Sequence, residues 1–102
     1  MARPEAALIR AVLQFLDLKG IPAWRNNSGA IKTASHFFRY GCVGSADILG
    51  LLPPEGKFLA IECKSGGQRA SRAQIAFLEA VNESGGIGIV ARTLDDVMEA
   101  IE

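Results

Sequence analysis

The stretch ADILGLLPPEGKFLAIECK, residues 46–64, decides the fold because it joins two apolar segments through a strong turn signal. The segments on either side of PPEG (residues 53–56) have the length and composition of β-strands, and paired prolines followed by Glu-Gly are typical of a turn. A four-residue loop pairs Leu52 with Lys57 and thereby sets the register of both strands. The sequence therefore predicts an antiparallel hairpin.

Continuing this register outward places Asp47 opposite Glu62, and alternation of side chains puts both on the same face as Lys64. Directly opposed Cβ atoms lie roughly 4.5–5.5 Å apart, so the two carboxylates repel each other unless a cation lies between them. Mg²⁺ and Mn²⁺ prefer carboxylate and water oxygens. The pattern predicts a Mg²⁺ or Mn²⁺ site beside a lysine that can hold a phosphate oxygen or orient an attacking water. The alternative is a structural Glu–Lys pair on an edge strand, with Asp47 ending a turn.

Outside this hairpin, apolar periodicity and capping signals predict three helices and two further strands. In chain order the expected elements are a helix at 4–18, a strand at 21–27, strands at 46–52 and 57–64, a helix at 71–84, a strand at 87–91 and a helix that begins at Thr93. Residues 27–29 are expected to form a turn, and residues 30–45 a loop or an irregular hairpin. The order α-β-β-β-α-β-α predicts one α/β domain over residues 1–102, with a central mixed sheet flanked by helices.

Two apolar stripes are expected to pack against this sheet, because their residues recur at helical spacing. They are Leu8, Ala11, Val12 and Phe15 in the first helix, and Ala73, Ala76, Phe77, Ala80 and Val81 in the second.

Length and composition favour a small globular protein. The chain has 102 residues, of which 49 % are apolar, and this is the size of one domain with one core. No run approaches the roughly 18 apolar residues of a membrane span, so a membrane partner is not expected. Cys42 and Cys63 have the pattern of free thiols in a reducing compartment, and the N-terminal residues do not resemble a secretory signal. The expected location is cytoplasmic.

Charge is distributed unevenly although the net formal charge is zero. The segment from Lys19 to Ala46 contains four basic residues and no acidic one, whereas acidic residues dominate from Glu79 onward. This asymmetry is consistent with one basic surface for a polyanion, or with two solvated faces that bind nothing.

Three ordered motifs resemble the PD-(D/E)xK nuclease superfamily, and most closely the virus-type replication-repair nuclease (VRR-NUC) domain. The motifs are G-S-A-D-I-L-G at 44–50, A-I-E-C-K at 60–64 and Q-x-x-F at 74–77. The similarity extends to WRNNSG at 24–29 and GGIGIVAR at 85–92, so it covers nearly the whole chain. It implies a restriction-endonuclease-like core and metal-dependent DNA cleavage. The superfamily's proline before the aspartate is Ala46 here, a departure that is common in this family.

The resemblance assigns a role to each residue of the centre. It implies that Asp47, Glu62 and the carbonyl of Cys63 bind Mg²⁺ or Mn²⁺, and that Lys64 is the catalytic lysine. Glu5 would complete the metal site through a bound water, although a glutamate in a first helical turn is also favoured by the helix dipole alone.

Gln74 would support the catalytic lysine or contact the phosphate. The alternative is a capping box, in which Gln74 is the reciprocal partner of Ser71. The side chains expected to contact DNA phosphates are Arg25, Asn26, Ser28, Lys32, Arg39, Arg69 and Arg72, and an ordinary polar turn is the alternative for residues 25–29.

The resemblance implies a structure-selective DNA endonuclease, encoded by a bacterium or phage. The resemblance implies a homodimer that cleaves branched DNA such as Holliday junctions without sequence specificity. Two alternatives remain: a DNA-binding module that has the fold without cutting, and a flap or single-strand nuclease.

Overall fold

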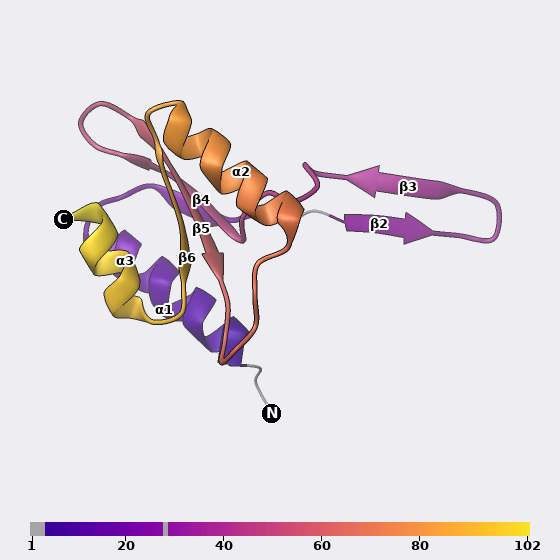
Figure 1. Cartoon of the computed structure of the whole chain (residues 1–102), viewed down its shortest axis with the longest axis horizontal. Helices are drawn as coiled ribbons and strands as arrows, with labels where there is room; N and C mark the ends of the chain where they lie inside the picture. The colour runs from indigo at the N-terminus through magenta and orange to yellow at the C-terminus, as the bar shows by residue number, and fades with distance from the viewer. Residues whose placement is uncertain (1–3, 28) are drawn as a thin grey trace.

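The computed structural model describes residues 4–27 and 29–102, and for residues 29–31 and 38–40 the backbone alone. The elements in chain order are α1 (Pro4–Leu18), β1 (Ala23–Arg25), β2 (Gly29–Lys32), β3 (Phe37–Tyr40), β4 (Ile48–Leu52), β5 (Lys57–Cys63), α2 (Arg72–Glu83), β6 (Ile87–Ala91) and α3 (Leu94–Ile101) (Figure 1). Within the described ranges, none of the helices has both the length and the apolar character needed to cross a membrane.

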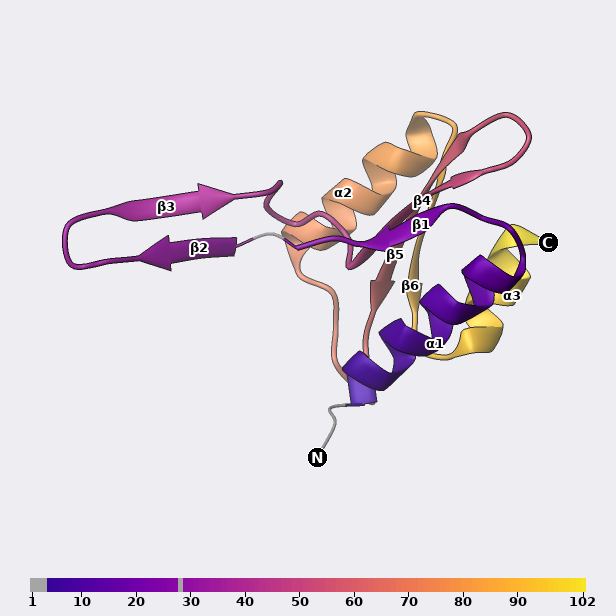
Figure 2. The ribbon, with the colours of Figure 1, turned by 180° about the vertical axis from the view of Figure 1, so that it is seen from behind.

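Four strands form the central sheet in the order β1-β4-β5-β6. β4 runs antiparallel to β1 and β5, and β6 runs parallel to β5. Helices α1 and α3 cover one face of this sheet and α2 covers the other, as Figures 1 and 2 show from opposite sides. Leaving aside the separate β2–β3 hairpin, the order is α-β-β-β-α-β-α, which confirms the predicted α/β fold with its mixed sheet.

The register of the β4–β5 hairpin is the predicted one. Leu52 pairs with Lys57 and Leu49 with Ala60, and the turn is closed by a hydrogen bond from the Gly56 N–H to the Leu52 carbonyl oxygen at 2.8 Å. Gly56 has φ of 77°, a conformation that a glycine adopts without steric cost. The loop therefore sets which residues of β4 and β5 share a face.

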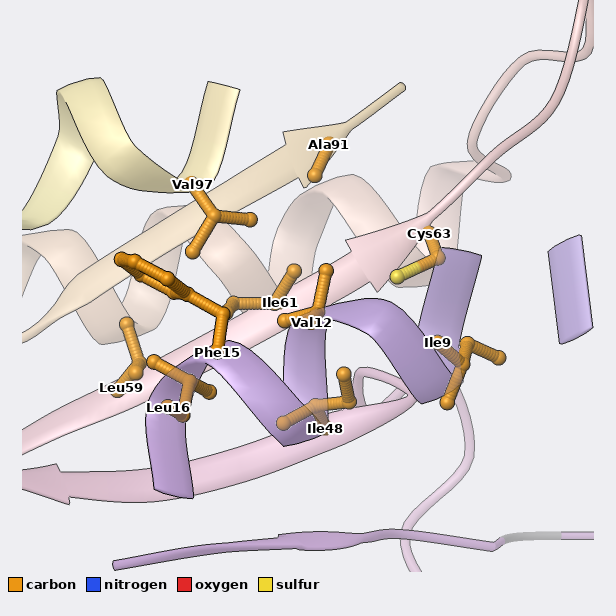
Figure 3. Packing of buried hydrophobic residues seen from close by; sticks show 10 residues of the cluster. All are labelled: Ile9, Val12, Phe15, Leu16, Ile48, Leu59, Ile61, Cys63, Ala91 and Val97. Carbon is orange, nitrogen blue, oxygen red and sulfur yellow. The ribbon is translucent and has the colours of Figure 1, made fainter. Parts of the chain in front are cut away.

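The larger core lies between the sheet and helices α1 and α3. Figure 3 shows its ten buried residues, which are Ile9, Val12, Phe15, Leu16, Ile48, Leu59, Ile61, Cys63, Ala91 and Val97. In α1 the fully buried stripe includes Ile9 and Leu16, while the predicted members Leu8 and Ala11 are half-buried. The predicted helix face was therefore rotated slightly from the observed one.

A smaller core lies on the other face, between α2 and the sheet. Its buried residues are Ala46, Ala60, Leu78 and Val81. The prediction for α2 was wrong in part, because Ala73, Ala76 and Ala80 are exposed and Leu78 is buried. Burying a leucine removes more apolar area from water than burying an alanine, so the leucine determines which face turns inward.

Residues 29–40 form an antiparallel hairpin, which was one of the two alternatives expected for residues 30–45, and its pairing is regular where an irregular one was expected. Gly29 pairs with Tyr40 and Lys32 pairs with Phe37. The hairpin extends away from the rest of the chain in both views (Figures 1 and 2), in a molecule whose longest dimension is 47 Å. Gly29 belongs to β2, and Ser28 of the predicted turn at 27–29 lies outside the described residues.

The outer edge of β6 is occupied by side chains at two positions. Asn82 at the end of α2 donates to the Gly88 carbonyl oxygen at 2.9 Å and accepts from the Gly88 N–H at 2.8 Å. The Arg92 N–H, just beyond the strand, donates to a carboxylate oxygen of Asp96 at 2.8 Å. Side chains from the two helices thus take the place of a fifth strand at these positions.

Candidate active site

Glu62 is the centre of the candidate site. It lies near the end of β5 on the face covered by α2, and it is 2 % exposed. Its Oε2 accepts a hydrogen bond from Gln74 Nε2 at 3.0 Å and lies 3.3 Å from Lys64 Nζ. The Lys64 side chain is 14 % exposed. The structure therefore brings Glu62, Lys64 and Gln74 together at a mostly buried position.

Asp47 lies directly before the neighbouring strand β4 and is held at both its side chain and its backbone. Its Oδ2 accepts a hydrogen bond from the Cys63 N–H at 2.9 Å, and its carbonyl oxygen accepts from the Asn26 N–H at 2.7 Å. Ile48 pairs with Ile61, so the next position outward sets Asp47 opposite Glu62, as predicted.

The electrostatics of this pair are unfavourable in the absence of a further cation. Burial first and the negative charge of Asp47 second raise the pKa of Glu62 from 4.5 to about 7, and Lys64 acts in the opposite direction. One ammonium group therefore does not offset burial and two adjacent carboxylates. A divalent cation between the two would remove the repulsion.

The backbone and side chain of Cys63 turn to different surroundings. Its thiol is buried with Ile9 and Val12 beneath α1 (Figure 3). Burial raises the pKa of Cys63 to about 12, with further contributions from the nearby carboxylates, and Arg25 acts in the opposite direction. The sulfur therefore stays protonated and is a poor metal ligand. Because the N–H and C=O of one strand residue point to the same edge, the Cys63 carbonyl faces the side of Asp47.

Glu5 lies near this centre but is not joined to it. It is half-buried in the first turn of α1, and its charge contributes to raising the pKa of Cys63. Within the described ranges, no hydrogen bond or ion pair joins the Glu5 carboxylate to another side chain. Among the described residues, no three His, Cys, Asp or Glu side chains are grouped closely enough to hold a metal ion. The role of Glu5 as a water-mediated ligand stays a prediction.

Gln74 forms the capping box that was one alternative from the sequence, and it contacts Glu62 where a contact with Lys64 or a phosphate was expected. Its Oε1 accepts from the Ser71 N–H at 2.8 Å and its own N–H donates to Ser71 Oγ at 3.1 Å, which completes the capping box. Its Nε2 at the same time donates to Glu62, and not to Lys64. Gln74 lies one turn before Phe77 and Leu78 on the inward face of α2, and this spacing is a sequence signal that it points toward the sheet.

The two functions of Gln74 can be separated by a matched pair of variants. Gln74→Glu keeps a capping-box acceptor but cannot donate to Glu62, so we expect cleavage to fall about tenfold, as for the loss of a partner that orients a metal ligand. Ser71→Ala removes only the cap, and we expect a loss of about 1 kcal/mol in stability with cleavage within about twofold of wild type. Urea unfolding and single-turnover cleavage check both; equal cleavage losses in the two variants would reduce Gln74 to a capping residue.

Two residues that hold the segment before Asp47 were not identified as such in the sequence. Asn26 Nδ2 donates to Ser45 Oγ at 2.7 Å and to the Ala46 carbonyl oxygen at 2.9 Å. Both amide hydrogens are thus used within the protein, so the structure gives Asn26 a positioning role where a phosphate contact was predicted. Gly44 has φ of 83°, and a Cβ there would lie 2.7 Å from the backbone of Ala73, so only glycine permits this approach to α2.

Arg92 holds the loop that follows Lys64. Its Nη1 donates to the Gly66 carbonyl oxygen at 3.0 Å across 26 residues of sequence. Such a contact depends on the parallel pairing of β5 with β6, and no local sequence pattern indicates it. The loop that carries the chain away from Lys64 is therefore tied to the far end of β6.

The other predicted phosphate contacts are distributed over several elements. Arg25, Lys32, Arg69 and Arg72 are exposed, and the charge of Arg25 reaches Cys63 beside the centre. Ser28 and the side chain of Arg39 lie outside the described part of the structure. Their contacts with phosphate stay predictions.

A family model matches most of the chain. The model of the VRR-NUC domain matches residues 5–94 of 102. The matched range contains Glu5, Asp47, Glu62, Lys64 and Gln74. No curated protein matches the sequence significantly.

Proposed function

The chain belongs to the VRR-NUC family of nuclease domains, and from this premise we propose that it is a Mg²⁺- or Mn²⁺-dependent DNA endonuclease. The observation that carries the proposal is the pairing of Asp47 with Glu62, whose pKa is raised to about 7 beside a single lysine. A centre used only for binding DNA gains nothing from two adjacent carboxylates, because they repel phosphate as well as each other.

The donor set suits a hard divalent cation. The oxygens of Asp47 and Glu62 would hold the ion together with the Cys63 carbonyl, and Glu5 would act through a water. When bound, such an ion lowers the pKa of a water ligand and stabilises charge that develops on the phosphoryl oxygens. The Cys63 thiol is protonated and buried on the other face, which argues against a soft metal bound through sulfur.

The chain's own side chains provide the remaining functions. Lys64 Nζ, near the surface at the end of β5, would hold a phosphate oxygen or orient the water that attacks phosphorus. Gln74 donates to the same oxygen of Glu62 that Lys64 approaches, and so fixes the orientation of that carboxylate. The exposed Arg25 would contact the DNA backbone, which gives affinity without sequence specificity.

The substrate that we propose is branched DNA such as a four-way junction, cleaved by a homodimer. A chain of 102 residues with one centre contacts a limited length of duplex, and two copies would place two centres across a branch point. Sedimentation velocity at micromolar concentration tests this directly. A chain that stays monomeric with and without junction DNA would remove the basis for paired cleavage.

The decisive experiment compares wild type with Lys64→Ala and with Lys57→Ala as a matched control. Lys57 is an exposed lysine at the opposite end of the same strand. Each protein is incubated with labelled four-way junction, flap, single strand and duplex, in Mg²⁺, Mn²⁺ or EDTA. We expect wild type and Lys57→Ala to cut only with a divalent ion, and Lys64→Ala to lose at least about 100-fold in rate.

Each outcome of this comparison selects one function. Preferred cutting of the junction supports the proposed substrate, whereas preferred cutting of a flap or single strand identifies the alternative nuclease class. Binding of DNA by wild type without cutting, in every metal condition, would establish a non-catalytic module and overturn the proposal.

A further inference from the structure

We infer that the β2–β3 hairpin is an arm that lies in the major groove of the duplex whose backbone is cut at the neighbouring site. The inference rests on the proposed function, and it adds which groove of the DNA duplex the chain binds. The two strands pack chiefly on each other, and in Figures 1 and 2 they extend away from the central sheet. A two-stranded hairpin without a core is marginally stable alone, which points to a partner along its length.

The dimensions of a β-ribbon select the groove. Two paired strands lie about 4.8 Å apart, and their side chains widen the ribbon further. The minor groove of B-DNA is about 6 Å wide, whereas the major groove is about 12 Å wide and admits a two-stranded ribbon. The major groove is therefore the part of a duplex into which this hairpin fits.

Charge favours DNA as the occupant. Lys32 pairs with Phe37 and Ala30 with Arg39, and alternation along a strand puts these four positions on one face of the ribbon. That face carries two basic positions, and residues 29–40 include no acidic residue. Lys32 is exposed, as is Phe37 with 60 % of its surface accessible. A basic face with an exposed aromatic ring is suited to the phosphates that border a groove.

The position of the hairpin connects it to the catalytic centre. The chain enters β2 just after Asn26, which hydrogen-bonds the Asp47 carbonyl oxygen and the segment before it. At the far end, the loop is closed by a hydrogen bond from the Thr33 N–H to the His36 carbonyl oxygen at 2.8 Å. At about 3.3 Å per residue, the six residues from Gly29 to Ala34 in the loop reach about 20 Å, or about six base pairs.

The test uses a shortened arm and a charge-reversed arm. Replacing residues 31–38 with Asn-Gly leaves Ala30 and Arg39 as a directly paired position closed by a two-residue turn, so the rest of the fold is retained. Lys32→Glu keeps the arm but reverses its charge. Lys57→Glu, on the exposed start of β5 at the opposite end of the strand from Glu62, is the matched control for the same change in net charge.

Single-turnover cleavage is measured at rising protein concentrations on two branched DNA substrates, one with a longer duplex of about 12 base pairs and one with a shorter duplex of about 4 base pairs. We expect the protein with the shortened hairpin to need an about tenfold higher concentration for half-saturation on the longer DNA duplex only. Its maximal rate should be unchanged. Lys32→Glu should also raise the half-saturating concentration, and its DNA affinity should depend less on salt concentration. Lys57→Glu should match wild type in both respects. Wild-type protein should protect guanine N7 in the longer DNA duplex from methylation, and the variant with the shortened hairpin should not.

Two results would overturn the inference. Equal half-saturating concentrations for wild type and the shortened arm would exclude a contribution to DNA binding. Loss of dimerisation in the shortened variant, with DNA affinity per chain unchanged, would assign the arm to a second copy. A wild-type protein that cuts nothing would count against the proposed function alone, because anisotropy of the labelled duplex still measures the arm's contribution to binding.

Discussion

Replacing Asp47 with asparagine is expected to abolish cleavage while making the metal-free protein more stable. Asparagine retains an oxygen that can accept the hydrogen bond from the Cys63 N–H, so the local geometry is kept. The substitution removes the negative charge that, after burial, is the second-largest cause of the raised pKa of Glu62. We expect a loss of at least about 100-fold in cleavage and a gain of about 1 kcal/mol in the free energy of unfolding at pH 8 with EDTA.

Two controls make this result specific. At pH 5, Glu62 is protonated in the folded chain and the repulsion is absent, so the gain in stability from Asp47→Asn should disappear. Asp17→Asn removes one negative charge at an exposed position near the end of α1 and should leave both cleavage and stability close to wild type. If Asp47→Asn were destabilising at both pH values, the two carboxylates would not repel each other in the manner inferred here.

The stability of the metal-free protein is expected to fall as the pH rises from about 5 to about 8. The pKa of Glu62 is raised from 4.5 to about 7 by burial first and by Asp47 second, so the folded chain binds this proton more tightly than the unfolded chain does. This contribution is fully present below about pH 4.5 and is lost as the pH passes 7. A pKa change of this size corresponds to a loss on the order of 3 kcal/mol in the free energy of unfolding.

Urea unfolding at pH 5, 6, 7 and 8 in EDTA measures this dependence. Glu62→Gln lacks the titrating group, so its stability should change much less over the same range. Saturating Mn²⁺ should recover the stability that the wild-type protein loses at pH 8. It should have little effect at pH 5, because a proton competes with the ion for the same carboxylate. A stability that rises from pH 5 to pH 8 in EDTA would contradict the prediction.

The centre of the fold could be predicted because local rules determine it. A four-residue loop sets the pairing of Leu52 with Lys57, and counting outward from that pair brings Asp47 opposite Glu62. Neither step depends on the rest of the chain. The capping box of Ser71 and Gln74 is similarly local, since both of its hydrogen bonds span three residues.

The helix faces were harder to predict for a physical reason. Alanine is compatible with either side of a helix, so the run of alanines in α2 indicated a face that proved to be exposed. The position of Leu78 carries more information, because exposing it leaves a larger apolar area in water. Weighting residues by the area that they can bury would have turned α2 to the observed face and placed Gln74 beside Glu62.

The contacts that position the site could not be predicted because they join distant parts of the chain. Asn26 reaches the segment before Asp47 across about twenty residues, and Arg92 reaches Gly66 across 26. Each depends on how strands pair and in which order they lie in the sheet. The sequence contains the polar residues, but only the assembled sheet determines their partners.

The side chains that occupy the outer edge of β6 also affect how the chain behaves at high concentration. An apolar strand at the edge of a sheet can recruit strands from other molecules and grow into a cross-β aggregate. Asn82 satisfies both outward groups of Gly88, and Asp96 satisfies the Arg92 N–H. Of the residues described in β6, this leaves Val90 between them, and one residue is too short a template for a new strand. The outer edge of β6 is therefore a poor template for fibres although the strand is apolar.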